Sequence, residues 1–103
     1  MSIDRAAPLR VAVLASGRGS NLQAIIDAIK SKQVHATIVA VISNKRDAAA
    51  LERARAHGLP DLFIDPKPFA GWPDSREAYD RTLLETLEHY HVELVLLAGY
   101  MKI

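Results

Sequence analysis

The sequence predicts an α/β fold in which a parallel β-sheet carries helices on both faces. Short apolar runs rich in β-branched residues alternate with stretches whose apolar residues recur at helical spacing. Half of the 103 residues are hydrophobic and 24% are charged, a balance typical of globular proteins. At this length we expect one domain at most.

The first strand, helix and second strand follow directly from these patterns. Leu9 to Ala15 is an apolar run without alternation, as expected of a central strand buried on both faces. The helix after it begins at Ser20, and its apolar residues form one stripe. The members of that stripe are Leu22, Ile25, Ile26 and Ile29. Ala36 to Ile42 has the composition of a second buried strand.

A shorter helix and strand come next. Asp47 can cap the helix, and Gly58 stands where a left-handed helix terminator belongs. The predicted inner face of this helix contains Ala50, Leu51 and Ala54. Asp61 to Ile64 is predicted to form a brief third strand.

The last part of the chain supplies a third helix and a fourth strand. The stretch from Asp65 to Pro73 contains three prolines and a glycine, which predicts a loop. Asp74 opens the helix, and Val92 to Ala98 is the fourth apolar run. The buried side of the helix is expected to contain Tyr79, Leu83, Leu87 and Tyr90.

This element order favours a Rossmann-like sheet with strand order 3-2-1-4, since parallel crossovers are right-handed. In such sheets ligands bind beyond the carboxyl ends of the strands. The segments expected at that edge are Ser16–Asn21, Ser43–Lys45 and Gly99–Ile103.

The fourth strand, Val92 to Ala98, would lie at an edge of the sheet although it is strongly apolar. Folded proteins usually avoid a long apolar edge strand. The chain ends about one turn later, so we expect a sheet that is cut short. Its edge would then need a missing C-terminal half or self-association.

Composition excludes several classes of protein. The formal net charge is +1, which gives no reason to expect nucleic acid or a membrane surface as a partner. Without cysteine the chain has neither a disulfide framework nor a thiolate zinc site. Residues 1–8 lack the apolar core of a signal peptide and are expected to be extended or disordered. We expect a cytoplasmic protein without a membrane span.

The strongest local motif, SGRGSN, spans Ser16 to Asn21 between the first strand and the first helix. Glycines permit a tight turn and a close approach of backbone N–H groups, while the helix N-terminus favours an anion. The ordinary alternative is a strand-to-helix turn in which Ser20 only caps the helix. A dinucleotide fingerprint would need a third glycine at Leu22, and no Gly-Lys-Ser/Thr of a nucleotide P-loop follows. A single terminal phosphate fits this motif best.

Four runs in register resemble the folate-dependent phosphoribosylglycinamide formyltransferase family, specifically its N-terminal half. They are SGRGSNLQAIIDA, ISNKRDAAALERA, DSREAYDRTL and LAGYMKI. The resemblance covers residues 9–103 and implies formyl transfer from 10-formyltetrahydrofolate to the amine of glycinamide ribonucleotide in purine synthesis.

The resemblance also implies roles for individual residues. Gly19, Ser20 and Asn21 match the cradle for the ribonucleotide phosphate. Arg76 matches a position that contacts the formyl folate, although a helix arginine is more commonly just solvated. The segment Met101, Lys102 and Ile103 matches part of the pterin site, with core packing as the alternative for its apolar members.

The resemblance assigns no catalytic residue to this chain, because the family's asparagine, histidine and aspartate lie beyond the fourth strand. The chain alone is therefore expected to be inactive. Its histidines fall on connections or helix ends and suggest neither catalysis nor a metal site; they are His35, His57, His89 and His91. The alternatives are a non-catalytic phosphate-binding domain and a related formyl-folate hydrolase or transferase with another acceptor.

Overall fold

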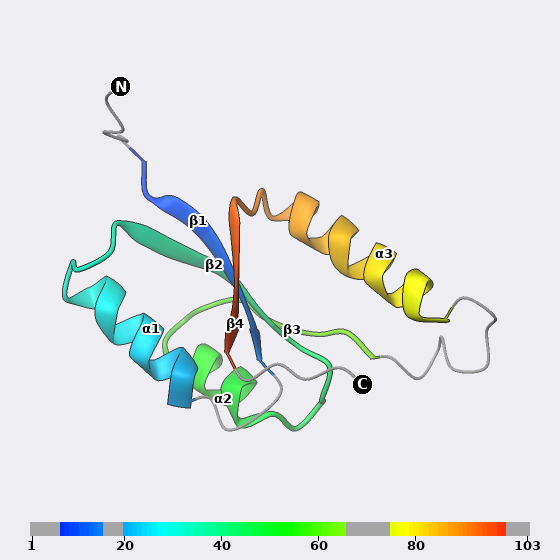
Figure 1. Ribbon diagram of the computed structural model, residues 1–103. Coiled ribbons are helices and arrows are strands. Elements are labelled where there is room, and N and C mark those ends of the chain that lie inside the picture. Colours follow the sequence, from blue (N-terminus) through cyan, green and yellow to red (C-terminus); the bar gives the residue numbers. More distant parts are fainter. Residues whose placement is uncertain (1–6, 16–19, 66–74, 99–103) are drawn as a thin grey trace.

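The computed structural model describes residues 7–15, 20–65 and 75–98 (Figure 1). Strands and helices alternate along the chain. They are β1 (Leu9–Ala15), α1 (Ser20–Lys30), β2 (Ala36–Ser43), α2 (Ala49–Ala56), β3 (Asp61–Phe63), α3 (Ser75–His89) and β4 (Leu94–Ala98). The strands form one parallel sheet in the order β3-β2-β1-β4, which confirms the predicted fold and strand order. Of the N-terminal residues expected to be extended or disordered, 1–6 lie outside the described residues.

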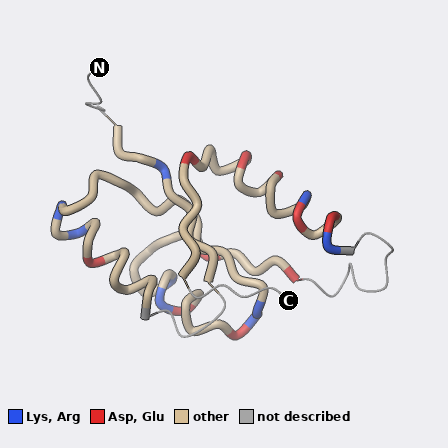
Figure 2. Tube along the Cα trace, in the orientation of Figure 1, with Lys and Arg blue, Asp and Glu red and all other residues tan. Residues whose placement is uncertain are grey.

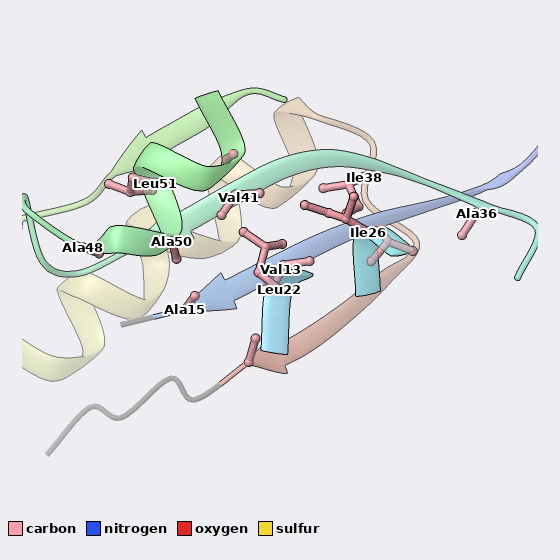
Figure 3. Close-up of a cluster of buried hydrophobic side chains, with 13 residues drawn as sticks. Val13, Ala15, Leu22, Ile26, Ala36, Ile38, Val41, Ala48, Ala50 and Leu51 are labelled. Atoms are coloured by element: carbon pink, nitrogen blue, oxygen red, sulfur yellow. The ribbon is translucent and has the colours of Figure 1, made fainter. Parts of the chain in front are cut away.

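Helices cover both faces of the sheet: α1 and α2 lie on one face and α3 on the other (Figure 1). The face under α1 and α2 holds the larger apolar cluster, in which Leu22 and Leu51 pack against strand residues such as Val13 (Figure 3). On the opposite face, Leu14, Ala40 and Ile42 form a smaller buried cluster. The predicted stripe of α3 packs there, through Leu83, Leu87 and Tyr90. The predicted inner faces of all three helices are therefore confirmed.

One irregularity changes which side chains of β2 point to each face. The pairing with β1 runs from Val11↔Ile38 directly to Ala12↔Ala40, so Val39 is an extra residue in β2. Side chains alternate between faces along a strand, and one extra residue reverses the sequence of faces. Accordingly Ile38 and Val41 both pack in the larger cluster, although they are an odd number of residues apart.

The ends of two elements differ from the sequence prediction. Asp47 does not cap α2: the N-cap residue is Ala48, and it makes no side-chain capping bond. β4 begins at Leu94 rather than Val92, because the Val92 N–H bonds back to the carbonyl of Leu87 at the end of α3. Gly58 has φ +71° just beyond α2, which confirms the predicted left-handed terminator.

β4 lies at an edge of the sheet, as predicted, and much of its apolar surface is open. The exposed fractions of Leu94, Val95 and Leu97 are 43%, 37% and 67%. The free edge also presents backbone groups to which another strand could bond. Among the residues that the structure describes, no helix is both long and apolar enough to cross a membrane.

Candidate phosphate-binding edge

The candidate site begins where β1 gives way to α1. β1 ends at Ala15 and α1 starts at Ser20, so this helix begins just beyond the carboxyl end of a central strand. Its first-turn N–H groups lack partners within the helix, and the helix dipole adds positive potential there. Asn21 is exposed in this first turn. An anion that approaches this edge would meet backbone donors and the Asn21 amide.

Two basic residues lie at the same edge, just after β2. The Ser43 hydroxyl is buried at the strand end and accepts a hydrogen bond from the backbone N–H of Lys45 at 3.1 Å. The guanidinium of Arg46 lies 4.9 Å from the centroid of the Phe63 ring. Lys45 and Arg46 are both exposed, and Figure 2 shows basic residues in this connection between β2 and α2. They add positive charge at the edge where an anion is expected.

A chain of polar contacts fixes the first half of α1 against α2. Arg53 Nη1 donates to Gln23 Oε1 at 2.9 Å, and Gln23 Nε2 donates to Asp27 Oδ1 at 2.9 Å. Gln23 lies within one turn of Ser20, so this contact holds the N-terminal turn of α1 in place. The sequence analysis did not identify Arg53. The sequence did hold one indication that Arg53 faces inward. Arg53 is three residues from buried Ala50 and adjacent to buried Ala54, so it lies near the inner face of α2.

The structure separates the residues expected to bind phosphate from the arginine expected to bind folate. Asn21 belongs to α1, which lies on the opposite face of the sheet from α3 (Figure 1). Arg76 is exposed in the first turn of α3. Tyr79, one turn later, donates from its hydroxyl to the Ile64 carbonyl at 3.4 Å and ties α3 to the segment after β3. Gly19 and the segment Met101, Lys102 and Ile103 lie outside the described residues.

The histidines lie away from this edge, as expected. Each one precedes a strand or ends a helix, which places it toward the amino ends of the strands; they are His35, His57, His89 and His91. Within residues 7–15, 20–65 and 75–98, no group of three or more histidine or acidic side chains is placed to hold a metal ion.

Comparison with protein families shows where this arrangement is found. Residues 9–103 match the family model described as formyl transferase. The phosphoribosylglycinamide formyltransferase of Escherichia coli K12 is 48% identical over 95 residues, which are 92% of this chain and 43% of that protein. The human trifunctional purine biosynthetic protein adenosine-3 is 42% identical over 94 residues, which are 91% of this chain and 9% of that protein.

Solved structures of formyl transferases and a deformylase have the same fold. Glycinamide ribonucleotide transformylase 1 from Symbiobacterium toebii superposes with a TM-score of 0.84 at 43% identity, covering 96% of this chain and 45% of that one. A formyltetrahydrofolate deformylase from Pseudomonas putida KT2440 superposes with a TM-score of 0.79 at 26% identity, covering 97% of this chain and 33% of that one. The chain thus spans less than half the length of these relatives.

Proposed function

Because the chain belongs to the formyl transferase family, we propose that it serves phosphoribosylglycinamide formyl transfer as the half that binds the phosphate. The formyl group would pass from 10-formyltetrahydrofolate to the amine of glycinamide ribonucleotide, a step of purine synthesis that we place in the cytoplasm. Residues 9–103 would be the N-terminal half of the formyltransferase domain. The observation that carries the proposal is the start of α1 directly beyond the carboxyl end of central β1.

We assign the ribonucleotide phosphate to the N-terminal turn of α1. Gly19 would let the backbone approach the phosphate closely, while Ser20 and Asn21 would donate from their side chains. The contact of Arg53 with Gln23 supports this role, because a helix end held in place loses less freedom on binding. Exposed Lys45 and Arg46 at the same edge would raise the local concentration of an anionic substrate.

We assign the formyl folate to the other side of this edge. Arg76 is exposed at the start of α3 and would contact the folate. Met101, Lys102 and Ile103 would contribute to the pterin site, Lys102 through its backbone. β4 ends at Ala98, so these residues follow the carboxyl end of a strand that pairs with β1. The two substrates would thus meet over neighbouring strands.

The proposed chemistry requires three things of the protein. A neutral amine attacks the formyl carbon, hydrogen-bond donors stabilise the oxyanion that forms, and a base or relayed water accepts the amine proton. Collapse of this intermediate breaks the bond between the formyl carbon and the folate nitrogen, which takes up a proton, so that tetrahydrofolate leaves. We assign neither the donors to the oxyanion nor the base to this chain. Its contribution would be to hold the two substrates in a reactive orientation, which can account for a large part of the barrier reduction. The proposed reaction uses no metal.

A second candidate is hydrolysis of the formyl folate, in which water replaces the ribonucleotide as acceptor. The fold similarity to the Pseudomonas putida deformylase favours it. Identity to that protein is 26%, against 43% and 48% for the ribonucleotide transferases from Symbiobacterium toebii and Escherichia coli. The phosphate site at α1 also has no evident use in a hydrolase, so we favour the transferase.

Calorimetry and steady-state kinetics test the assignment of both substrates on a protein that joins residues 1–103 to the proposed C-terminal half, hereafter the full-length protein. Gly19→Val should abolish binding of glycinamide ribonucleotide, since a branched side chain blocks the approach to the backbone. Arg76→Ala should raise the Michaelis constant for the formyl donor and leave ribonucleotide affinity unchanged. Arg81→Ala serves as the control because Arg81 is an exposed arginine of the same helix.

Four outcomes would contradict parts of the proposal. Unchanged ribonucleotide affinity in Gly19→Val would remove the phosphate from α1. Equal effects of Arg76→Ala on both substrates would identify a structural arginine. Release of formate without any ribonucleotide would favour the hydrolase, and binding without turnover in the full-length protein would leave a phosphate-binding domain.

A further inference from the structure

A small hollow lies near the amino-terminal ends of the strands, whereas the proposed substrate site lies at their carboxyl ends. It opens between the C-terminal ends of α1 and α2 and the beginning of β2, with a volume of about 120 Å³. Its walls are mostly apolar: Ile26, Ile29, Ile38 and Leu59 line it together with Thr37, Lys30 and His57. Ile26 and Ile38 belong to the larger buried cluster and are only 4% and 6% exposed (Figure 3). The floor of the hollow is therefore part of the folded core.

The hollow has the size of one compact apolar group. An engineered apolar cavity of about 150 Å³ in another protein binds benzene. A volume near 120 Å³ therefore accommodates a ring or a branched chain of roughly four to six carbons. Long acyl chains and nucleotides are too large.

A cationic group stands at the mouth of the hollow. Lys30 Nζ lies 3.1 Å from Nδ1 of His57, and both residues line the hollow. In the tautomer of His57 whose Nδ1 carries no proton, Lys30 Nζ donates to Nδ1 and keeps two further N–H groups for a ligand. Lys30 forms no ion pair with a described carboxylate. A ligand with negative charge at the mouth would thus find a cation that is not already neutralised.

The C-terminal ends of α1 and α2 lie beside the mouth, but they do not cancel the attraction of Lys30 for an anion. Carbonyls at the end of α1 accept backbone bonds from Ser31, Lys32 and Gln33. Carbonyls at the end of α2 accept similar bonds from His57 and Gly58. Because these carbonyls already have donors, the helix ends repel an anion less than open carbonyls would.

We propose that this hollow binds a small monocarboxylate whose compact apolar body enters between Ile29 and Leu59 while its carboxylate pairs with Lys30. A neighbouring, larger hollow lies beyond Ile29, next to Pro8 and Val34. Of the four apolar wall residues of the smaller hollow it shares only Ile29, and the smaller hollow carries the inference. The proposed site is independent of the formyl transfer proposed above, because it lies at the other end of the strands.

Amide chemical shifts of the isotope-labelled full chain test the site, with benzoate, benzyl alcohol and benzylamine as probes. Benzoate should shift amides around Ile29, Lys30 and Leu59 with saturation. Benzyl alcohol should bind more weakly at the same place, and benzylamine should not bind. Lys30→Gln should weaken benzoate binding about three- to fivefold, the effect of one exposed charge pair, and should leave benzyl alcohol unaffected.

Two further variants separate binding in the hollow from general attraction of anions. Leu59→Trp fills the hollow and should abolish benzoate binding while the remaining amide spectrum keeps its dispersion. Lys45→Gln removes an exposed lysine at the carboxyl end of the strands and should leave the benzoate-induced shifts around Ile29, Lys30 and Leu59 unchanged. Benzoate shifts centred elsewhere, equal loss in Lys45→Gln, or full affinity in a folded Leu59→Trp protein would each overturn the proposal.

Discussion

β1 and β4 are neighbouring parallel strands with similar apolar sequences, yet they have opposite relations to solvent. Leu14 pairs with Leu97; the first is 5% exposed and the second 67%. Val11 pairs with Leu94, and their exposed fractions are 1% and 43%. The residue types hardly differ, so the difference comes from position: β1 lies between two strands and β4 has only one neighbour.

The two strands are also held by different interactions. Burial under helices on both faces stabilises β1, whereas the start of β4 is attached through polar contacts from Arg10. The Arg10 guanidinium donates to the carbonyls of Tyr90 at 2.8 Å and His91 at 3.1 Å, and the backbone N–H of Arg10 donates to Glu93 Oε1 at 2.9 Å. An apolar sequence therefore predicts a strand, but the strand order determines how that strand is stabilised.

The largest expected effect concerns the open side of β4 in the 103-residue chain purified by itself. Exposed apolar surface costs about 25 cal/mol per Å², and the stability of a small domain is only about 5–15 kcal/mol. We expect this chain to self-associate through β4, to melt without cooperativity, and to show no turnover. Leu97→Lys should reduce the associated fraction measured by light scattering, because charge on an edge strand opposes pairing. A wild-type monomer with a sharp thermal transition would contradict this expectation.

Truncation of the two paired leucines should sharpen the contrast. Leu14→Ala removes a buried side chain and should lower the free energy of unfolding by about 3 kcal/mol. Leu97→Ala changes the same residue type at a position that is 67% exposed in the 103-residue chain, but the residues expected to cover β4 in the full-length protein would bury it there, so it should cost about 2 kcal/mol. Urea denaturation of the full-length protein measures both. A cost of no more than about 0.5 kcal/mol for Leu97→Ala would mean that β4 stays open and needs no covering half.

The smallest effect is expected from the contacts that attach β4. Arg10→Met keeps much of the apolar stem but removes the bonds to Tyr90 and His91, which should cost about 1 kcal/mol given their partial exposure. Arg55→Met is the matched control: Arg55 pairs with Asp61 at 2.7 Å, but its side chain is 67% exposed. That change should stay within about 0.5 kcal/mol. If both substitutions lowered the free energy of unfolding by the same amount, the contacts of Arg10 would contribute no more than an ordinary surface interaction.

Sequence patterns predicted the fold well where the periodicity is unambiguous. The stripe from Leu22 to Ile29 and the run from Leu9 to Ala15 each favour a single structure, and both predictions are confirmed. Asp47 was a wrong prediction because any short polar residue before a helix can be taken for a cap. The extra residue Val39 was not predicted, since a strand apolar on both faces has no alternation to interrupt.

The site was only partly predictable. The glycine-rich motif Ser16 to Asn21 pointed to a phosphate, and the structure starts α1 at the predicted Ser20. The contact of Arg53 with Gln23 joins residues 30 positions apart. Each lies in one of the runs that carry the resemblance, but nothing in either run indicates that the two side chains meet. The roles of Gly19, Arg76 and Met101 to Ile103 stay predictions based on resemblance.

The extra residue in β2 has an evolutionary consequence. Val39 contributes to neither buried cluster and is 9% exposed, so exchange for another apolar residue would disturb little. Loss of its codon would be a different event. The segments on either side of the deletion would come into regular alternation, and either Ile38 or Val41 would have to leave the cluster that they now share. Lineages that keep this sheet should therefore vary freely in the identity of the residue at this point but rarely in the length of the strand.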